Sequence, residues 1–106
     1  MKAASSALAA HIAGEVKDFD PKNWMDSKDA RKMALFTQYA VAASVQAMAQ
    51  AGLKDGGFDP VRTGVYSGNG IGGFEILHNS YGKFYLQGWE RLPPLTVPLL
   101  IGNEAA

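Results

Sequence analysis

The feature that most restricts what this chain can fold into is the stretch from Met33 to Leu53, which contains no charged side chain. Alanine dominates the stretch, and Ala51-Gly52 near its end is a common signal for the C-terminus of a helix. A helix that is apolar almost all the way round is usually buried inside a larger protein. The sequence therefore predicts a long buried helix that needs other elements on every side.

The start of this helix is also marked. Asp26 or Ser27 is a suitable N-cap, which places the first helical turn at about Lys28. The uncharged stretch is almost long enough to cross a bilayer, but five polar side chains make it a poor membrane segment: Thr37, Gln38, Ser44, Gln46 and Gln50. We therefore expect protein around this helix and no membrane partner.

A glycine-rich segment gives the second constraint. Residues 63–66 have the β-branched and aromatic character of a short buried strand, and four positions without a Cβ follow at Gly68, Gly70, Gly72 and Gly73. From Phe74 onward, apolar residues recur every three or four positions until Gly88. The segment predicts a strand, a tight glycine turn and a second helix.

The glycine turn has two interpretations. Gly68-x-Gly70-x-x-Gly73 formally matches a dinucleotide fingerprint, and Glu90 lies roughly where such folds carry a ribose-binding acid. Glu90, however, directly precedes Arg91 near Pro93, and no second strand is evident around it. A small nucleotide-binding domain therefore stays open as one alternative. The other is that the glycines allow strand, helix and a neighbouring element to pack closely.

The two ends of the chain carry weaker signals. Residues 12–19 alternate loosely between apolar and polar side chains, which favours a short strand or extended edge that ends in a turn at Asp20-Pro21. Near the other end, Pro93-Pro94 and Pro98 favour an extended surface segment. The last residues are an apolar run followed by a helix-like Asn-Glu-Ala-Ala, an ending that suggests truncation.

Composition narrows the classes of function. A chain of 106 residues is long enough for one small domain, which would bury roughly 60–65% of its unfolded surface. Ten acidic and ten basic residues cancel, so no general attraction to nucleic acid is expected. No cysteine is present, which excludes disulfides, thiolate metal sites and a cysteine nucleophile, and is compatible with a cytoplasmic location. No histidine or carboxylate pair has metal spacing, and the first ten residues are too weakly apolar for a signal peptide.

Few side chains suggest chemistry. Lys28, Arg31 and Lys32 form a basic cluster that is either a docking patch for an acidic partner or an ordinary solvated helix end neutralised by nearby aspartates. His78 lies near Glu75, so a general base can be imagined, although a surface or packing histidine is the commoner case. His11, in the terminal segment, carries less weight still.

Several segments read together resemble one family. They are Ile12 to Pro21, Lys28 to Met33, Gln38-Tyr39-Ala40, Ala51-Gly52-Leu53, Gly68 to Gly73 and Val97-Pro98. In unbroken order from about residue 12 to 106, they are similar to the β-ketoacyl-acyl-carrier-protein synthases II, the 3-oxoacyl-ACP synthases of the thiolase-like superfamily. The resemblance implies an α/β fold and makes residues 1–106 a partial N-terminal ketosynthase domain, with 1–11 as an unmatched start.

This resemblance implies a fragment of a fatty-acid condensing enzyme. Such enzymes are α-β-α-β-α sandwiches, usually homodimers, that take an acyl group onto a cysteine and condense it with malonyl-ACP with the help of two histidines. This chain has none of those three residues, so we expect it to be inactive alone and to need no cofactor. A non-catalytic module that binds the carrier protein or dimerises is the alternative.

The resemblance also assigns individual residues. Lys28, Arg31 and Lys32 match basic positions that face the acidic acyl-carrier protein, and Arg91 matches a further docking position. Ile71 matches a residue that lines the acyl pocket near the dimer interface. Leu95-Thr96 stands where the family commonly has two phenylalanines, one of which reaches towards the partner subunit's pocket.

Overall fold

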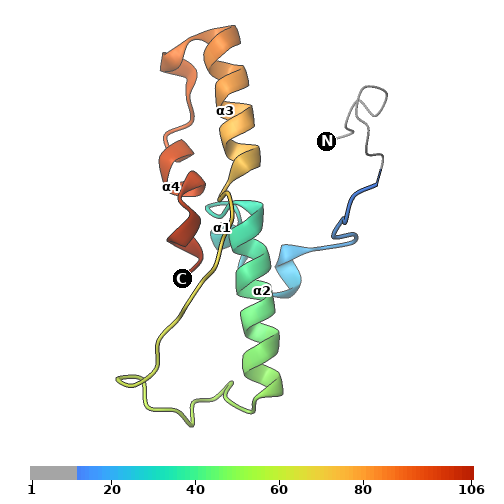
Figure 1. The fold of residues 1–106 in the computed structure, drawn as a ribbon, viewed down its shortest axis with the longest axis vertical. Helices are drawn as coiled ribbons and strands as arrows, with labels where there is room; N and C mark the ends of the chain where they lie inside the picture. Colours follow the sequence, from blue (N-terminus) through green and yellow to red (C-terminus); the bar gives the residue numbers. More distant parts are fainter. Residues whose placement is uncertain (1–11) are drawn as a thin grey trace.

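The computed structural model describes residues 12–106, and this part of the chain consists of helices and loops without a strand. Figure 1 shows two longer helices joined by an extended connection, with short helices near their junction. In chain order the elements are η1 (Pro21–Asn23), α1 (Ser27–Ala30), α2 (Leu35–Gln50), α3 (Phe74–Gln87), η2 (Trp89–Arg91), α4 (Thr96–Leu100) and η3 (Gly102–Ala105). The expectations for residues 1–11, namely the unmatched start, the signal-peptide reading and His11, lie outside the described residues.

The predicted strands are therefore wrong for this chain. Residues 12–19 and 63–66 have no strand partner, and Val65 and Tyr66 are 70% and 97% exposed. A strand forms only where its backbone N–H and C=O groups find a ladder partner, and an isolated extended segment bonds to water instead. Of the α/β sandwich that the family resemblance implied, the described residues contain the helices alone.

The C-terminus of α2 confirms the predicted helix end. Gly52 adopts a φ of 70°, and its N–H donates to Ala49 O at 3.2 Å. The N–H of Leu53 donates to Met48 O at 2.9 Å. These two bonds form a Schellman motif, in which a left-handed glycine satisfies the last carbonyls of the helix.

The predicted continuous helix from Lys28 is wrong, because the chain breaks between α1 and α2. Asp26 caps α1 as expected, with its carboxylate accepting from Lys28 N at 2.7 Å. Residues 31–34 then leave the helix, and Ala34 is extended with a ψ of 161°. The side-chain amide of Gln38 donates to Ala30 O at 2.9 Å and Met33 O at 3.2 Å. This side chain supplies donors to carbonyls that a continuous helix would have satisfied.

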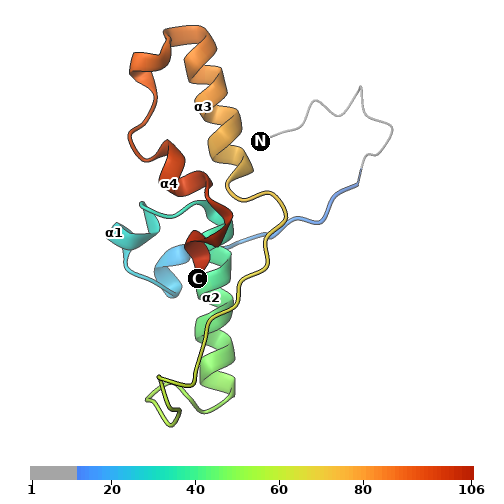
Figure 2. The same cartoon turned by 60° about the vertical axis from the view of Figure 1, so that its left-hand side comes forward.

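Within this chain α2 is not the buried helix that its composition predicts. Thr37 and Ala42 are its only buried residues. In both views α3 and α4 lie beyond the N-terminal end of α2, and the C-terminal half of α2 extends away from them (Figures 1 and 2). The helix formed where its sequence predicts it, but the layers that such a helix needs on every side are absent among the described elements.

The glycine turn packs against the C-terminal segment. The N–H of Gly73 donates to Leu100 O at 3.2 Å, and an added Cβ at Gly72 or Gly73 would overlap the backbone oxygen of Leu100 or Leu99, respectively. Immediately after this contact α3 begins at Phe74, and it ends before Gly88, as the spacing of apolar residues predicts. Gly72 and Gly73 therefore allow two backbones to approach, which confirms the packing interpretation for these two positions, whereas a Cβ at Gly68 or Gly70 would meet no atom within 4 Å.

The expected extended segment around Pro98 is instead the short helix α4. Pro98 is the third residue of this helix, where a missing N–H costs no intrahelical hydrogen bond. Both the N–H of Thr96 and its hydroxyl donate to Pro93 O, at 3.0 Å and 2.8 Å. These bonds fix the turn that starts the helix.

The chain builds very little core. Among residues 12–106 the buried hydrophobic residues are three alanines, and no large side chain in this range is fully buried. The accessible surface is 8914 Å², whereas a folded monomer of this mass exposes about 5,700 Å² and its unfolded chain about 16,400 Å². A little under half of the unfolded surface is therefore buried, less than the share predicted from length. In the described part of the chain, no helix has both the length and the apolar character needed to cross a membrane.

Candidate functional site

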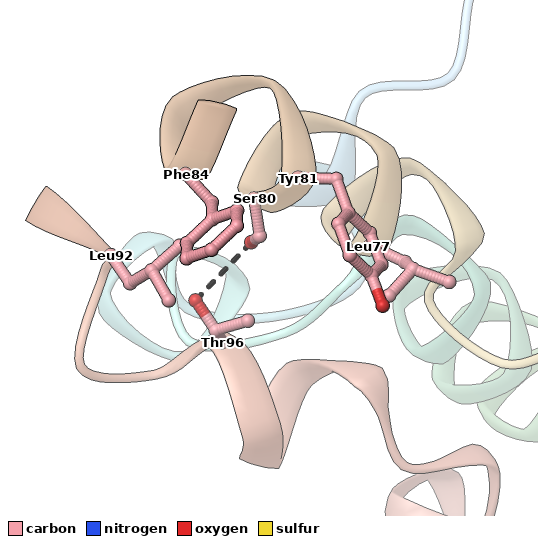
Figure 3. Close-up of a pocket in the computed structure, with 6 residues that line it drawn as sticks. All are labelled: Leu77, Ser80, Tyr81, Phe84, Leu92 and Thr96. Carbon is pink, nitrogen blue, oxygen red and sulfur yellow. Dashed lines mark hydrogen bonds between the residues drawn. The ribbon is translucent and has the colours of Figure 1, made fainter. Parts of the chain in front are cut away.

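A mostly apolar pocket lies between α3 and the segment that leads into α4 (Figure 3). It has a volume of about 260 Å³ and is lined by Leu77, Ser80, Tyr81, Phe84, Leu92 and Thr96. The four residues from α3 are spaced by three and four positions, so they share one face of the helix. Sequence reasoning found the helical period but missed Ser80 and Leu92 as pocket residues, because only the fold shows which face α4 covers.

The pocket contains one polar contact. Ser80 Oγ and Thr96 Oγ1 lie 3.3 Å apart, and Thr96 Oγ1 also lies 2.8 Å from Pro93 O (Figure 3 shows the first contact). Because the threonine hydroxyl donates to the carbonyl, its oxygen accepts from Ser80. Both hydroxyls are thus satisfied, and the lining includes no carboxylate, amine or imidazole. Such a pocket can bind an apolar group, and the phenol of Tyr81 is the one ionisable side-chain group in its lining.

The structure does not bring the two predicted acyl-pocket residues together. Thr96 lines the pocket, whereas Ile71 is 72% exposed in the glycine turn and is not part of the lining. The side chain of Asn69 holds that turn, since its Oδ1 accepts from the N–H of Ile71 at 3.0 Å and from the N–H of Gly72. Ile71 is therefore a fixed but uncovered apolar side chain in this chain.

The same hydrogen bonds contradict the nucleotide-binding interpretation. A phosphate-binding glycine turn offers free backbone N–H groups at a helix N-terminus and follows a strand. Here the N–H groups of Ile71 and Gly72 donate to Asn69, that of Gly73 to Leu100 O, and that of Phe74 to Gly72 O. No strand precedes the turn in the described residues. These four backbone donors of the turn are therefore not available to a phosphate.

The predicted docking cations lie on α1 and the turn that follows it. Lys28, Arg31 and Lys32 are all exposed. Arg31 is oriented by a bond from its Nε to Ser27 O at 3.1 Å. Lys32 lines a different hollow from Arg31, one that it shares with two carboxylate residues of this chain, Asp29 and Glu104. The three cations therefore do not form one uniform patch.

Arg91 lies apart from that cluster. It is the last residue of η2, which follows the C-terminal end of α3, whereas α1 lies near the N-terminal end of α3 (Figures 1 and 2). Arg91 is exposed, and Glu90 directly precedes it. In this chain the structure does not join Arg91 to the cations of α1.

Glu75 does not act on His78 as a catalytic partner but has a structural role. Glu75 Oε1 accepts from the N–H of Leu35 at 3.0 Å. It thereby caps α2, whose own N-cap residue Ala34 has no side-chain acceptor. His78 is exposed one turn further along α3. A capping residue forty positions away in sequence leaves no local signal, which is why sequence reasoning missed this role of Glu75.

The comparisons with known proteins agree with one another. Residues 2–96 match the family model of the β-ketoacyl synthase N-terminal domain. The chain is 40% identical over 99 residues to 3-oxoacyl-[acyl-carrier-protein] synthase 2 of Vibrio harveyi, covering 93% of this chain and 24% of that protein. With the enzyme of the same name from Staphylococcus aureus strain N315, the identity is 39% over 95 residues, covering 90% of this chain and 23% of the relative. The chain thus spans about a quarter of the length of these relatives.

Proposed function

The chain belongs to the β-ketoacyl synthase family, as a piece of its N-terminal domain, and we propose that it forms part of a fatty-acid condensing enzyme. The reaction of that enzyme is acyl transfer to a cysteine followed by decarboxylative Claisen condensation with malonyl-ACP. The observation that carries the proposal is the family match over residues 2–96, which includes both longer helices and the first residue of α4. We place this activity in the cytoplasm.

The proposed contribution of this chain is binding and positioning. Its 106 residues contain no cysteine, so the chain by itself cannot carry an acyl group on a thiolate. The hydroxyls of Ser80 and Thr96 are hydrogen-bonded in an apolar pocket without a neighbouring base, so neither is an activated nucleophile. We therefore propose that the chain alone is catalytically inactive.

The pocket on α3 is the part of the chain suited to an apolar substrate. Leu77, Phe84 and Leu92 supply apolar walls, and Thr96 stands at the predicted acyl-pocket position. An acyl chain placed there would lose contact with water while the Ser80 and Thr96 hydroxyls keep their hydrogen bonds. Ile71 is exposed. Its proposed contact with the acyl group and with the second subunit of a homodimer requires surfaces from outside this chain.

The exposed cations suit an acidic partner. Lys28, Arg31 and Lys32 lie within one short segment, and clustered cations attract and orient acidic proteins. We propose the acyl-carrier protein as this partner. Arg91, at the other end of α3, would be a separate contact point and would join the same surface only in a larger assembly.

A chimera tests the proposal directly. Residues 2–96 of this chain would replace the matching segment of the Vibrio harveyi synthase, and condensation of an acyl thioester with malonyl-ACP would be measured. We expect measurable condensation, with a loss smaller than the roughly hundredfold that a misplaced positioning segment causes. The control is the same chimera without the nucleophilic cysteine. A folded, dimeric chimera that is no faster than this control would contradict the proposal.

A non-catalytic binding or dimerising module is a second candidate. The specific observation in its favour is that the cations of α1 and several large apolar side chains, including Leu86 and Trp89, are exposed in the chain as it stands. Incubation with acyl-ACP followed by intact-mass measurement addresses both candidates. Binding without an added acyl mass is expected, and a stable acyl adduct would contradict the proposed lack of a nucleophile.

A further inference from the structure

A broad hollow lies between η1 and the start of α2, beside the basic cluster. Its volume is about 640 Å³, and it is lined by Pro21, Lys22, Ser27, Ala30, Arg31, Met33 and Gln38. Two of these residues are cations, and none is acidic. Lys22 is exposed on η1. It adds a positive charge to this surface that the family resemblance did not assign.

The walls of the hollow are held by hydrogen bonds. Arg31 Nε donates to Ser27 O at 3.1 Å, which orients the guanidinium and leaves four of its five N–H donors for other acceptors. Gln38 ties α1 to α2 through its bonds to Ala30 O and Met33 O. Asp20 caps η1 by accepting from the backbone N–H of Lys22 at 3.0 Å. The elements that carry Lys22 and Arg31 are therefore positioned before any partner arrives, which lowers the ordering cost of binding.

The neighbouring hollow around Lys32 has the opposite charge balance. It has a volume of about 220 Å³, and Asp29 and Glu104 line it together with Lys32. Carboxylates of the same chain compete with an acidic partner for the lysine ammonium and repel that partner's own carboxylates. The two hollows predict that Arg31 acts with Lys22 rather than with Lys32.

We infer that Lys22 and Arg31 form the main anchor for the acidic carrier protein proposed above, whose carboxylate side chains enter the hollow between η1 and α2. The guanidinium of Arg31 binds carboxylates through paired N–H groups, and the ammonium of Lys22 adds a compact point charge. The apolar residues of the lining, Pro21, Ala30 and Met33, contact the aliphatic parts of these side chains. This inference rests on the proposed docking of the acyl-carrier protein and makes Lys22 its specificity-determining residue.

Isothermal titration of the full chain with acyl-carrier protein at low salt tests the inference. We expect Lys22→Ala and Arg31→Ala to raise Kd about threefold to fivefold each, as for exposed ion pairs. Lys22→Glu should raise Kd more than about tenfold, because it places a like charge against the partner. Lys32→Ala should raise Kd less than either of these alanine substitutions, because Asp29 and Glu104 share the hollow of Lys32. Lys83→Ala, which removes the same charge from α3, is the matched control and should change Kd less than about twofold.

The outcomes separate the inference from the proposed function. If the wild-type chain binds the carrier protein but Lys32→Ala weakens binding more than Lys22→Ala, the inference is overturned and carrier docking stands. A second probe is a helical peptide with glutamates along one face. If the chain binds this peptide in a Lys22-dependent manner but not the carrier protein, carrier docking is overturned and the inference with it, although the hollow binds carboxylates. If the chain binds neither probe, both the inference and carrier docking are overturned. Far-UV circular dichroism of each variant is the control that its helices are intact.

Discussion

The two ends of α3 differ sharply in how they are held. At the N-terminal end, Gly73 is buried with its N–H on Leu100 O, and Glu75 reaches across to the first N–H of α2. At the C-terminal end, Tyr85 and Leu86 are 78% and 85% exposed. Small residues and backbone contacts hold one end, and large, mostly exposed apolar side chains make up the other. Residue size alone therefore does not indicate where this chain is packed.

The contacts at the exposed end are local. The rings of Tyr81 and Tyr85 stack at 6.3 Å, and those of Phe84 and Tyr85 meet edge to face at 5.3 Å. All three rings belong to α3, so these contacts need no tertiary structure. The contacts at the packed end join segments far apart in sequence. We therefore expect the free energy of unfolding to depend on the packed end, and four substitutions test this comparison.

The largest effect is expected from Gly73→Ala. The added Cβ would overlap Leu99 O, and that atom is backbone, so α4 has to move. We expect a loss of about 2–3 kcal/mol in the free energy of unfolding, measured by urea denaturation followed by circular dichroism.

Gly68→Ala is the matched control for that substitution. A Cβ at Gly68 meets no atom within 4 Å, and its φ is not positive. We expect a change within about 0.5 kcal/mol. Equal losses in the free energy of unfolding for Gly73→Ala and Gly68→Ala would show that replacing any glycine of the turn is destabilising. The contact between Gly73 and α4 would then not be the cause.

Glu75→Ala is expected to have the next largest effect. It removes the carboxylate that accepts from Leu35 N, and hydrogen bonds to charged groups contribute about 1.5 kcal/mol or more. Amide hydrogen exchange should show faster exchange in the first turn of α2. The exposed Glu90→Ala serves as the control, and protection of Leu35 that survives Glu75→Ala would contradict the capping role.

A smaller loss is expected from Thr96→Val, which keeps the shape of the side chain but removes the hydroxyl. Ser80 is 7% exposed and would lose its partner in the pocket. We expect a loss of about 1 kcal/mol in the free energy of unfolding. In the double variant with Ser80→Ala the two losses should be less than additive, whereas full additivity would show that the two hydroxyls do not interact.

The smallest effect is expected at the exposed end. Leu86→Gln should change the free energy of unfolding by less than about 0.5 kcal/mol, because the side chain is already in water. Leu77→Ala, in the pocket on the same helix, should lower the free energy of unfolding more in the same urea denaturation measurement. A large loss at Leu86 would mean that this end of α3 is covered in solution.

Sequence reasoning was accurate where the signal is local. The Asp26 cap, the helix end at Ala51-Gly52 and the bounds of α3 each depend on residues a few positions apart. Composition alone was also sufficient to exclude a cysteine nucleophile, because the chain contains no cysteine. The family resemblance was confirmed by the match over residues 2–96.

Sequence reasoning failed where an outcome depends on distant neighbours. The pattern at Val65-Tyr66 is that of a strand, but in the described residues no second strand lies beside it. The composition of α2 predicts burial, yet Thr37 and Ala42 are the only residues of this helix that are buried. The site shows the same limit, since Thr96 lines a pocket whereas Ile71, assigned to the same function, does not.

The sequence by itself determined where α2 and α3 end, which family the chain resembles and which reactions a chain without cysteine cannot perform, because each follows from nearby residues or from residue type. The tertiary structure alone decided that Gly72 and Gly73 meet the backbone of α4, that Glu75 caps α2, and that Arg31 shares a hollow with Lys22 rather than Lys32. The physical reason is that hydrogen bonds and steric contacts act over a few ångströms of space, whatever the separation in sequence.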